Sequence, residues 1–163
     1  MYRNFYKAGQ KVEHAFAQLA EQRGWSTRMV PAHLDANQHW DVEISQPHQK
    51  LLVDVKGMKK ICRRDASPQD KWIWLEVCGV ADDGWLYAGH ADLIAFETKE
   101  GFILAERPVL IDLVELLVPP KSSFVKHPWE AEYRLYNREG RKDILTMVEA
   151  SCVRKSSWSF WEK

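Results

Sequence analysis

The residues best suited to chemistry stand at the end of one short apolar segment, 51–57, with the sequence Leu-Leu-Val-Asp-Val-Lys-Gly. Side chains alternate between the two faces of a strand, so Asp54 and Lys56 share one face while the flanking valines share the other. Asp41 lies in the preceding segment, 40–44, and a hairpin pairing brings it close to Asp54 and Lys56. Two such carboxylates suit a hard divalent cation such as Mg²⁺. An adjacent lysine can orient or deprotonate a water molecule and offset charge on a phosphate in a transition state.

This arrangement resembles the PD-(D/E)XK nuclease superfamily, which includes restriction-type endonucleases and Holliday-junction-resolvase-like enzymes. In that family an acid opens one strand and an acid-x-Lys triplet ends the next; Asp41 and Asp54-Val55-Lys56 match these positions. Many resolvase-like members also carry a glutamate on the preceding helix, and Glu13 matches that place. One position departs from the pattern, because Trp40 stands where the family has a proline. The resemblance covers about the first half of the chain, from Glu13 to Glu76.

The resemblance implies a fold, a cofactor and a substrate. The fold is a restriction-endonuclease-like core of the α/β (α+β) class, with a central mixed β-sheet flanked by helices. Asp41, Asp54 and the backbone carbonyl of Val55 would hold Mg²⁺ (or Mn²⁺). Lys56 would position the water or stabilise developing charge, and Glu13 would complete the catalytic set. The substrate would be DNA, cleaved at a phosphodiester bond, and the enzyme would be a homodimer because two strands need two sites.

Two glutamates have a structural interpretation beside the functional one. Glu13 lies at the border of the apolar stripe of its predicted helix, where it is either a solvated surface residue or part of the metal site. Glu76 shares strand parity with Trp72 and Trp74. If this strand lies beside Asp54, Glu76 supplies a third carboxylate to the metal; otherwise it forms a structural ion pair.

A second acid-x-Lys triplet, Glu97-Thr98-Lys99, has a different context. It leads directly into Glu100-Gly101, which is typical of a turn, and no acid-bearing strand immediately precedes it. We therefore expect a solvated hairpin tip whose substitution leaves activity unchanged. For Asp54-Val55-Lys56 the corresponding structural interpretation is an edge strand with a charged solvent face.

The chain carries 23 Lys and Arg and 23 Asp and Glu, which excludes a strongly basic protein but not a local basic patch. The basic residues gather directly after segment 51–57 and again near a late hairpin, with acids concentrated between them. This sorting predicts a face that follows nucleic-acid phosphates, and ordinary surface charge is the alternative. The proposed nucleic-acid-binding residues are Lys59, Lys60, Arg63, Arg64, Arg141 and Lys142.

The remaining patterns predict one domain over residues 1–163, with a C-terminal hairpin and tail from about residue 129. An apolar periodicity predicts a first helix, and a proline-initiated apolar run predicts a second. A helix followed mostly by strands favours the α+β class. The predicted helices are 6–23 and 108–117, and the predicted strands are 40–44, 50–56, 71–77, 93–97, 102–105, 133–137 and 143–147. A short strand followed by a loop at residues 30–34 is expected after the first helix, and no element is assigned beyond residue 153.

Several function classes are excluded by composition. No apolar run approaches the roughly 18–20 residues that cross a bilayer, and the first residues lack a signal sequence, so no membrane partner is expected. The three cysteines are odd in number and far apart, which favours a cytoplasmic protein without disulfides. No glycine-rich phosphate loop or zinc-type histidine spacing is present. The tryptophans, Trp85 among them, are interpreted as packing residues.

A fold of this kind does not determine its function, because the same scaffold can serve binding alone. The alternative is therefore a catalytically inactive nuclease-fold module that binds nucleic acid or a partner protein. Binding of Mg²⁺ or Mn²⁺ distinguishes the two, since only an active site requires it.

Overall fold

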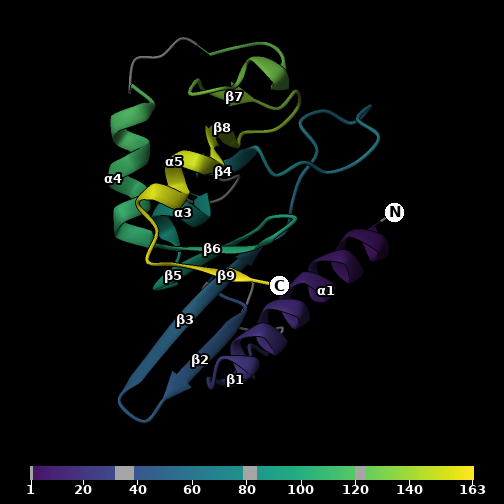
Figure 1. Ribbon diagram of the computed structural model, residues 1–163. Helices are drawn as coiled ribbons and strands as arrows, with labels where there is room; N and C mark the ends of the chain where they lie inside the picture. Colours follow the sequence, from purple (N-terminus) through teal and green to yellow (C-terminus); the bar gives the residue numbers. More distant parts are fainter. Residues whose placement is uncertain (1, 32–38, 79–83, 120–123) are drawn as a thin grey trace.

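The computed structural model describes residues 2–31, 39–78, 84–119 and 124–163. Within them the chain forms two β-sheets with helices packed around them, and the protein belongs to the α+β class (Figure 1). None of the helices in these ranges is both long and apolar enough to span a membrane.

The larger sheet has six strands in the order β1-β2-β3-β5-β6-β9 and is mixed in direction. The first three strands form an antiparallel meander, β5 runs parallel to β3, and β6 and β9 continue antiparallel. Their bounds are β1 Ser26–Met29, β2 Val42–Gln46, β3 Gln49–Lys56, β5 Leu93–Glu97, β6 Gly101–Glu106 and β9 Ser159–Glu162.

The smaller sheet has three antiparallel strands in the order β4-β8-β7 and is attached beside the larger one (Figure 1). Its strands are β4 Trp72–Cys78, β7 Tyr136–Asn137 and β8 Ile144–Glu149. The helices of this part are α3 Gly84–Ala88, α4 Arg107–Leu117, the 3₁₀ turn η1 Pro128–Glu130, and α5 Ala150–Lys155.

The first helix, α1 (Tyr2–Gln22), covers one face of the larger sheet (Figure 1). Its apolar stripe includes Phe16, which is fully buried and stacks on Trp161 of β9 at a ring-centroid distance of 5.5 Å. Gly57, just after β3, permits close approach, because a Cβ there would lie 3.1 Å from the Val12 side chain. Val53 and Val55 face this helix side of the sheet, as the alternation predicts.

The opposite face of the larger sheet packs against the smaller sheet and its helices. Ile94 and Phe96 of β5 meet Leu75 of β4 and Val148 of β8 in this second core. Leu52 of β3 packs against the same cluster, so the face that carries Asp54 and Lys56 points between the two layers of the protein.

Most predicted elements are confirmed, including both long helices, the β2–β3 and β5–β6 hairpins and the β7–β8 hairpin. The short strand expected before the loop at residues 30–34 is confirmed as β1, which ends at Met29, and residues 32–38 lie outside the described residues. The unassigned tail forms α5 and β9, and β9 completes the edge of the larger sheet beside β6.

Candidate functional site

The β2–β3 hairpin brings Asp41 and Asp54 together, as predicted. Val42 pairs with Val53, and the Asp41 N–H donates to the Val53 carbonyl at 2.8 Å, which places Asp41 opposite Asp54. The Asp41 side chain is fixed further, because its Oδ2 accepts the Val55 N–H at 2.7 Å. The two carboxylates thus lie at the same end of the neighbouring strands β2 and β3.

Asp54 is only 2% exposed and forms an ion pair with the neighbouring ammonium. Its Oδ1 lies 2.7 Å from Lys56 Nζ. Its Oδ2 is buried and has no hydrogen-bond partner among the described residues. A buried carboxylate oxygen without a donor is costly unless another positive group satisfies it.

The protonation of Asp41 reflects this crowding of acids. Burial raises the pKa of Asp41 to about 8, and the charges of Asp54 and Glu13 act in the same direction. The Val55 N–H and Lys56 lower the pKa but do not compensate. Asp41 therefore keeps its proton at neutral pH in the metal-free protein, and a bound divalent cation could replace that proton.

Lys56 is held between charges of opposite sign and an aromatic face. Burial lowers the pKa of Lys56, but the charges of Asp54, Asp41 and Glu76 raise it by more, so this ammonium stays protonated at neutral pH. Lys56 Nζ also lies 4.7 Å from the ring centroid of Trp85, in α3. The sequence interpretation of Trp85 as a packing residue missed this contact, and no local pattern relates it to β3.

The two further glutamates reach the site from different elements. Glu13 lies on α1, and its charge acts on Asp41, so the helix does bring an acid towards the pair. The condition set for Glu76 is wrong, because β3 has β2 and β5 as neighbours and β4 belongs to the other sheet. Glu76 nevertheless lies within electrostatic reach of the site, since its charge raises the pKa of Lys56.

No three Asp, Glu, His or Cys side chains of the described residues are arranged as a ready metal cage. The residues that fit a metal are therefore the pair Asp41 and Asp54, with the unpartnered Asp54 Oδ2 as the strongest indication. Two carboxylates supplemented by waters and backbone or substrate oxygens are the usual setting for Mg²⁺, which keeps several waters. The role that the resemblance gives to the Val55 carbonyl stays a prediction.

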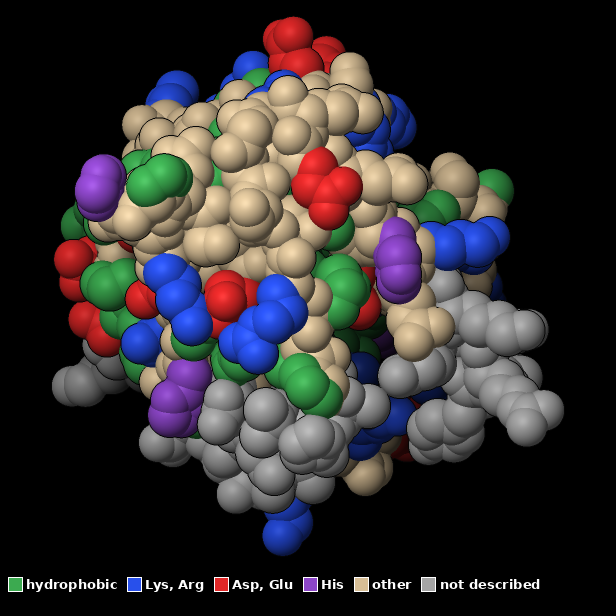
Figure 2. All heavy atoms as spheres, turned by 90° about the horizontal axis from the view of Figure 1, so that it is seen from below, with side chains coloured by type: hydrophobic (Ala, Val, Ile, Leu, Met, Phe, Trp, Pro, Cys, Tyr) green, Lys and Arg blue, Asp and Glu red, His purple; other side chains and the backbone are tan. Residues whose placement is uncertain are grey.

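The predicted basic residues occupy two segments. Lys59 lies near Lys56: burial lowers the pKa of Lys59, and the charge of Lys56 lowers it further. Lys60, Arg63 and Arg64 follow on the same loop, where all three are exposed. Arg141 and Lys142 are exposed on the turn between β7 and β8. On the face of the molecule shown in Figure 2, unlike in these two basic segments, Lys and Arg side chains lie beside Asp and Glu side chains.

The expectation of a solvated tip for the second acid-x-Lys triplet is wrong for Glu97. The Glu97 side chain is 15% exposed, accepts the Met58 N–H at 3.3 Å and pairs with Lys163 at 3.0 Å. It thereby ties the end of β3 to the C-terminal residue. Lys99 does lie in the turn, exposed and 3.6 Å from Asp70.

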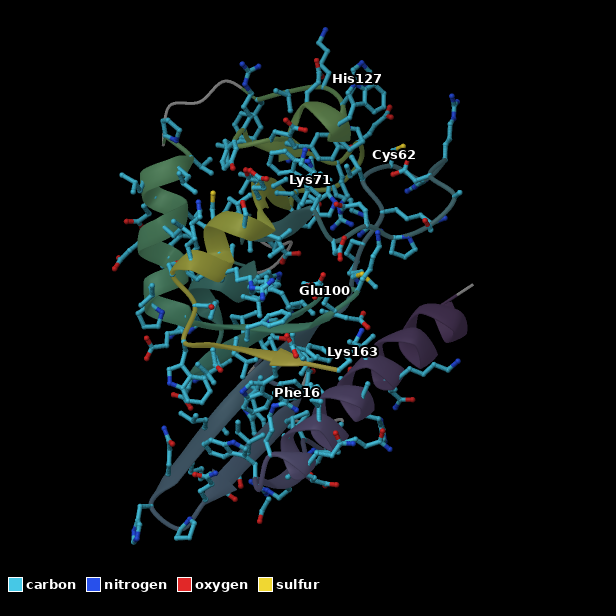
Figure 3. The ribbon with its side chains drawn as sticks, in the orientation of Figure 1. Phe16, Cys62, Lys71, Glu100, His127 and Lys163 are labelled. Carbon is cyan, nitrogen blue, oxygen red and sulfur yellow. The ribbon has the colours of Figure 1, made fainter. Side chains whose placement is uncertain are left out.

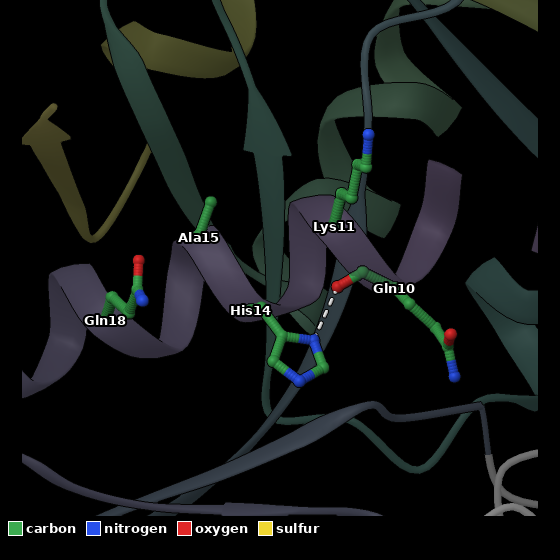
Figure 4. A pocket seen from close by; sticks show the side chains of 5 residues that line it. All are labelled: Gln10, Lys11, His14, Ala15 and Gln18. Atoms are coloured by element: carbon green, nitrogen blue, oxygen red, sulfur yellow. Dashed lines mark hydrogen bonds between the residues drawn. The ribbon is translucent and has the colours of Figure 1, made fainter. Parts of the chain in front are cut away.

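Two hollows on the described part of the surface are lined by other residues. One, of about 390 Å³, is a shallow depression on α1 lined by polar and small side chains (Figure 4). Its only drawn interaction is between His14 Nδ1 and the Gln10 carbonyl, at 2.7 Å. It contains no carboxylate, and we assign it no part in the chemistry.

Comparison with known proteins gives no further assignment: no family model, curated protein or solved structure matches this chain. The interpretation of the site therefore depends on the chemistry of its own residues.

Proposed function

We propose that the protein is a metal-dependent nuclease that hydrolyses phosphodiester bonds, with DNA as the substrate that the family resemblance favours. The observation that carries the proposal is the buried pair Asp41 and Asp54, in which Asp54 is ion-paired with Lys56 but keeps one oxygen without a donor, while Asp41 has a pKa of about 8. A purely structural cluster has no need of a buried carboxylate oxygen without a donor.

Each residue has a distinct role in this proposal. Asp41 and Asp54 would hold Mg²⁺ or Mn²⁺, which when bound supplies Lewis-acid activation of phosphate and water. Lys56, already protonated, would act as a cation that binds a non-bridging phosphate oxygen and offsets its developing negative charge. Glu13 would bind or orient a water molecule of the site from α1, because its charge already reaches Asp41.

The test is Asp54→Asn, which keeps the side-chain shape and removes the charge that the cation needs. We expect loss of cleavage of labelled DNA in Mg²⁺ or Mn²⁺, together with loss of Mn²⁺ binding by calorimetry. The matched control is Lys99→Ala in the second acid-x-Lys triplet, which should cleave normally because Lys99 is exposed in a turn. Full cleavage by Asp54→Asn, or no cleavage by the wild type on linear, circular, single-stranded and branched DNA or RNA, would overturn the proposal.

A further inference from the structure

Positive charge gathers at the turn between β7 and β8, which carries Arg138, Arg141 and Lys142. Arg138 follows β7, Asp143 precedes β8, and the guanidinium of Arg138 forms an ion pair with the Asp143 carboxylate. Asp143 is 1% exposed, whereas the Arg138 side chain is 38% exposed. A guanidinium anchored from below by a buried carboxylate keeps a fixed position while part of its donor fork faces solvent.

Two more arginines converge on Arg138. Arg141 belongs to the same turn, and Arg63 comes from the loop that follows β3. Burial lowers the pKa of Arg138, and the positive charges of Arg141 and Arg63 lower it further, while Glu76 acts in the opposite direction. Arg138 therefore lies within electrostatic reach of Arg63 from a distant segment and of Arg141 from its own turn, whose backbone N–H donates to the Arg138 carbonyl at 3.0 Å.

The loop that carries Arg63 is fixed to the smaller sheet. Trp74 of β4 donates its Nε1–H to the Lys60 carbonyl at 3.1 Å, and its ring lies 6.1 Å from that of Tyr136 in β7. Asp65 accepts the Cys62 N–H at 2.9 Å, which closes the turn around Arg63. Cys62 and His127, labelled in Figure 3, lie towards the same end of the molecule, the end of the smaller sheet.

Glu76 connects this arginine cluster to the catalytic group. Its charge raises the pKa of Lys56 on one side and that of Arg138 on the other. Glu76 stands on the face of β4 that also carries Trp72 and Trp74, whereas Ile73 and Leu75 point into the core. The cluster therefore flanks the catalytic group on the side of the smaller sheet.

We propose that Arg63, Arg138 and Arg141 form a phosphate-binding subsite for the nucleic-acid backbone beside the scissile bond, with Asp143 as the residue that positions Arg138. The location beside a scissile bond rests on the proposed nuclease function; the subsite itself does not. A phosphate relieves the mutual repulsion of the three guanidiniums, and an anchored fork binds it with little loss of side-chain entropy. In this proposal the larger sheet would carry the catalytic residues, and the smaller sheet would carry the residues that bind the nucleic-acid backbone.

Binding is measured in EDTA and in the Asp54→Asn background, so that no cleavage intervenes, with a fluorescein-labelled DNA duplex and its single strand. The double variant Arg63→Ala/Arg141→Ala should raise Kd about tenfold or more at low salt. The slope of log K against log salt should fall by about two, because about two phosphate contacts are lost. Lys50→Ala is the matched control. It removes an exposed charge at the other end of β3, and its partner Glu43 keeps Arg28 as a second ion pair.

The role of Asp143 is tested separately with Asp143→Asn. This variant keeps every arginine, so the salt slope should remain while Kd rises several-fold because Arg138 loses its anchor. Removal of both partners in Arg138→Met/Asp143→Asn should reduce the slope by about one. This double variant leaves no unpaired buried carboxylate, and thermal melting confirms that each variant is folded.

The outcomes separate this proposal from the nuclease assignment. Wild-type Kd and slope in Arg63→Ala/Arg141→Ala, an equal loss in Lys50→Ala, or no binding of either probe by the parent protein would overturn the subsite. If the subsite variants lose binding but the wild type cleaves nothing, the nuclease assignment fails and the subsite stands as part of a binding module. If the wild type cleaves and the variants bind normally, the subsite alone fails.

Discussion

The ammonium of Lys56 lies 4.7 Å from the ring centroid of Trp85 and 2.7 Å from Oδ1 of Asp54. A lysine side chain has several rotatable bonds, so a single ion pair does not fix its end. The indole of Trp85 provides a second contact for the ammonium and is itself packed against Phe96, at a ring-centroid distance of 6.3 Å. The two contacts together hold the ammonium where it can meet a phosphate.

We therefore predict that Trp85 positions Lys56. Trp85→Leu should lower kcat about tenfold with little change in KM, because a cation–π contact of about 1–2 kcal/mol is lost. Trp85→Phe keeps an aromatic face and should recover most of kcat. Trp129→Leu serves as the control, since Trp129 is an exposed tryptophan stacked on His127. Equal kcat losses in the Leu and Phe variants would contradict this role.

The pKa of Asp41 predicts a pH-dependent stability of the metal-free protein. The folded-state pKa of about 8 lies above the ordinary value of 3.8, so the native state binds more protons than the unfolded state between these pH values. The stabilising contribution is complete below about pH 4 and is lost as pH rises towards 8, by up to about 1.4 kcal/mol per pH unit. Melting in EDTA should therefore occur at lower temperature as pH rises, and Asp41→Asn should flatten the curve.

Asp65 provides a control of opposite sign. Its pKa is lowered by hydrogen bonds from the Cys62 side chain and backbone, so its contribution is present above the ordinary carboxyl pKa and is lost on acidification. Asp65→Asn should leave the decline between about pH 5 and 8 in place. Added Mg²⁺ should remove that decline in the wild type, because the cation displaces the Asp41 proton. A melting temperature that rises from pH 5 to 8 in EDTA, about the range between the two pKa values, would disprove the assignment.

Lys56 and Asp54 should separate catalysis from metal binding. Lys56→Met removes the cation that occupies Asp54 Oδ1, so Mn²⁺ affinity should be equal or tighter. Turnover should nevertheless fall by roughly 10²-fold or more, because charge on the phosphate is no longer offset. Asp54→Asn should lose both properties. Calorimetry with Mn²⁺ and a single-turnover assay measure them, and parallel loss of metal binding in both variants would place Lys56 in the metal site instead.

The local part of the site could be predicted because it follows from strand geometry alone. The period of two separates Asp54 and Lys56 from Val53 and Val55, and the turn at Pro47 sets the register that brings in Asp41. Both facts are contained in fewer than twenty consecutive residues, a short range for a hairpin. The helix that carries Glu13 is equally local, because its apolar stripe fixes which side meets the sheet.

The rest depends on contacts between distant segments. An apolar strand such as β4 can pair with any free edge, and nothing in its own sequence selects β8 rather than β3. The Trp85 contact follows from that choice, since α3 packs beside β4. The position of β9 depends likewise on Phe16 and Trp161, which are separated by most of the chain and stack only after the larger sheet has formed.

Glu97 gives the last prediction and replaces the expectation of a silent turn residue. Its carboxylate accepts the Met58 N–H just after β3 and pairs with Lys163, so it links β3, β5 and the chain end. Glu97→Gln retains one acceptor but loses the charge, and should lower the free energy of unfolding by about 1 kcal/mol. Any loss in kcat should correspond to a smaller free-energy change than this. Glu100→Gln is the matched control: it is an exposed glutamate of the same hairpin, 3.7 Å from Arg154, and should melt as the wild type does. Denaturant unfolding measures the difference in stability between Glu97→Gln and Glu100→Gln. Identical midpoints for the two variants would show that Glu97 behaves as a solvated residue.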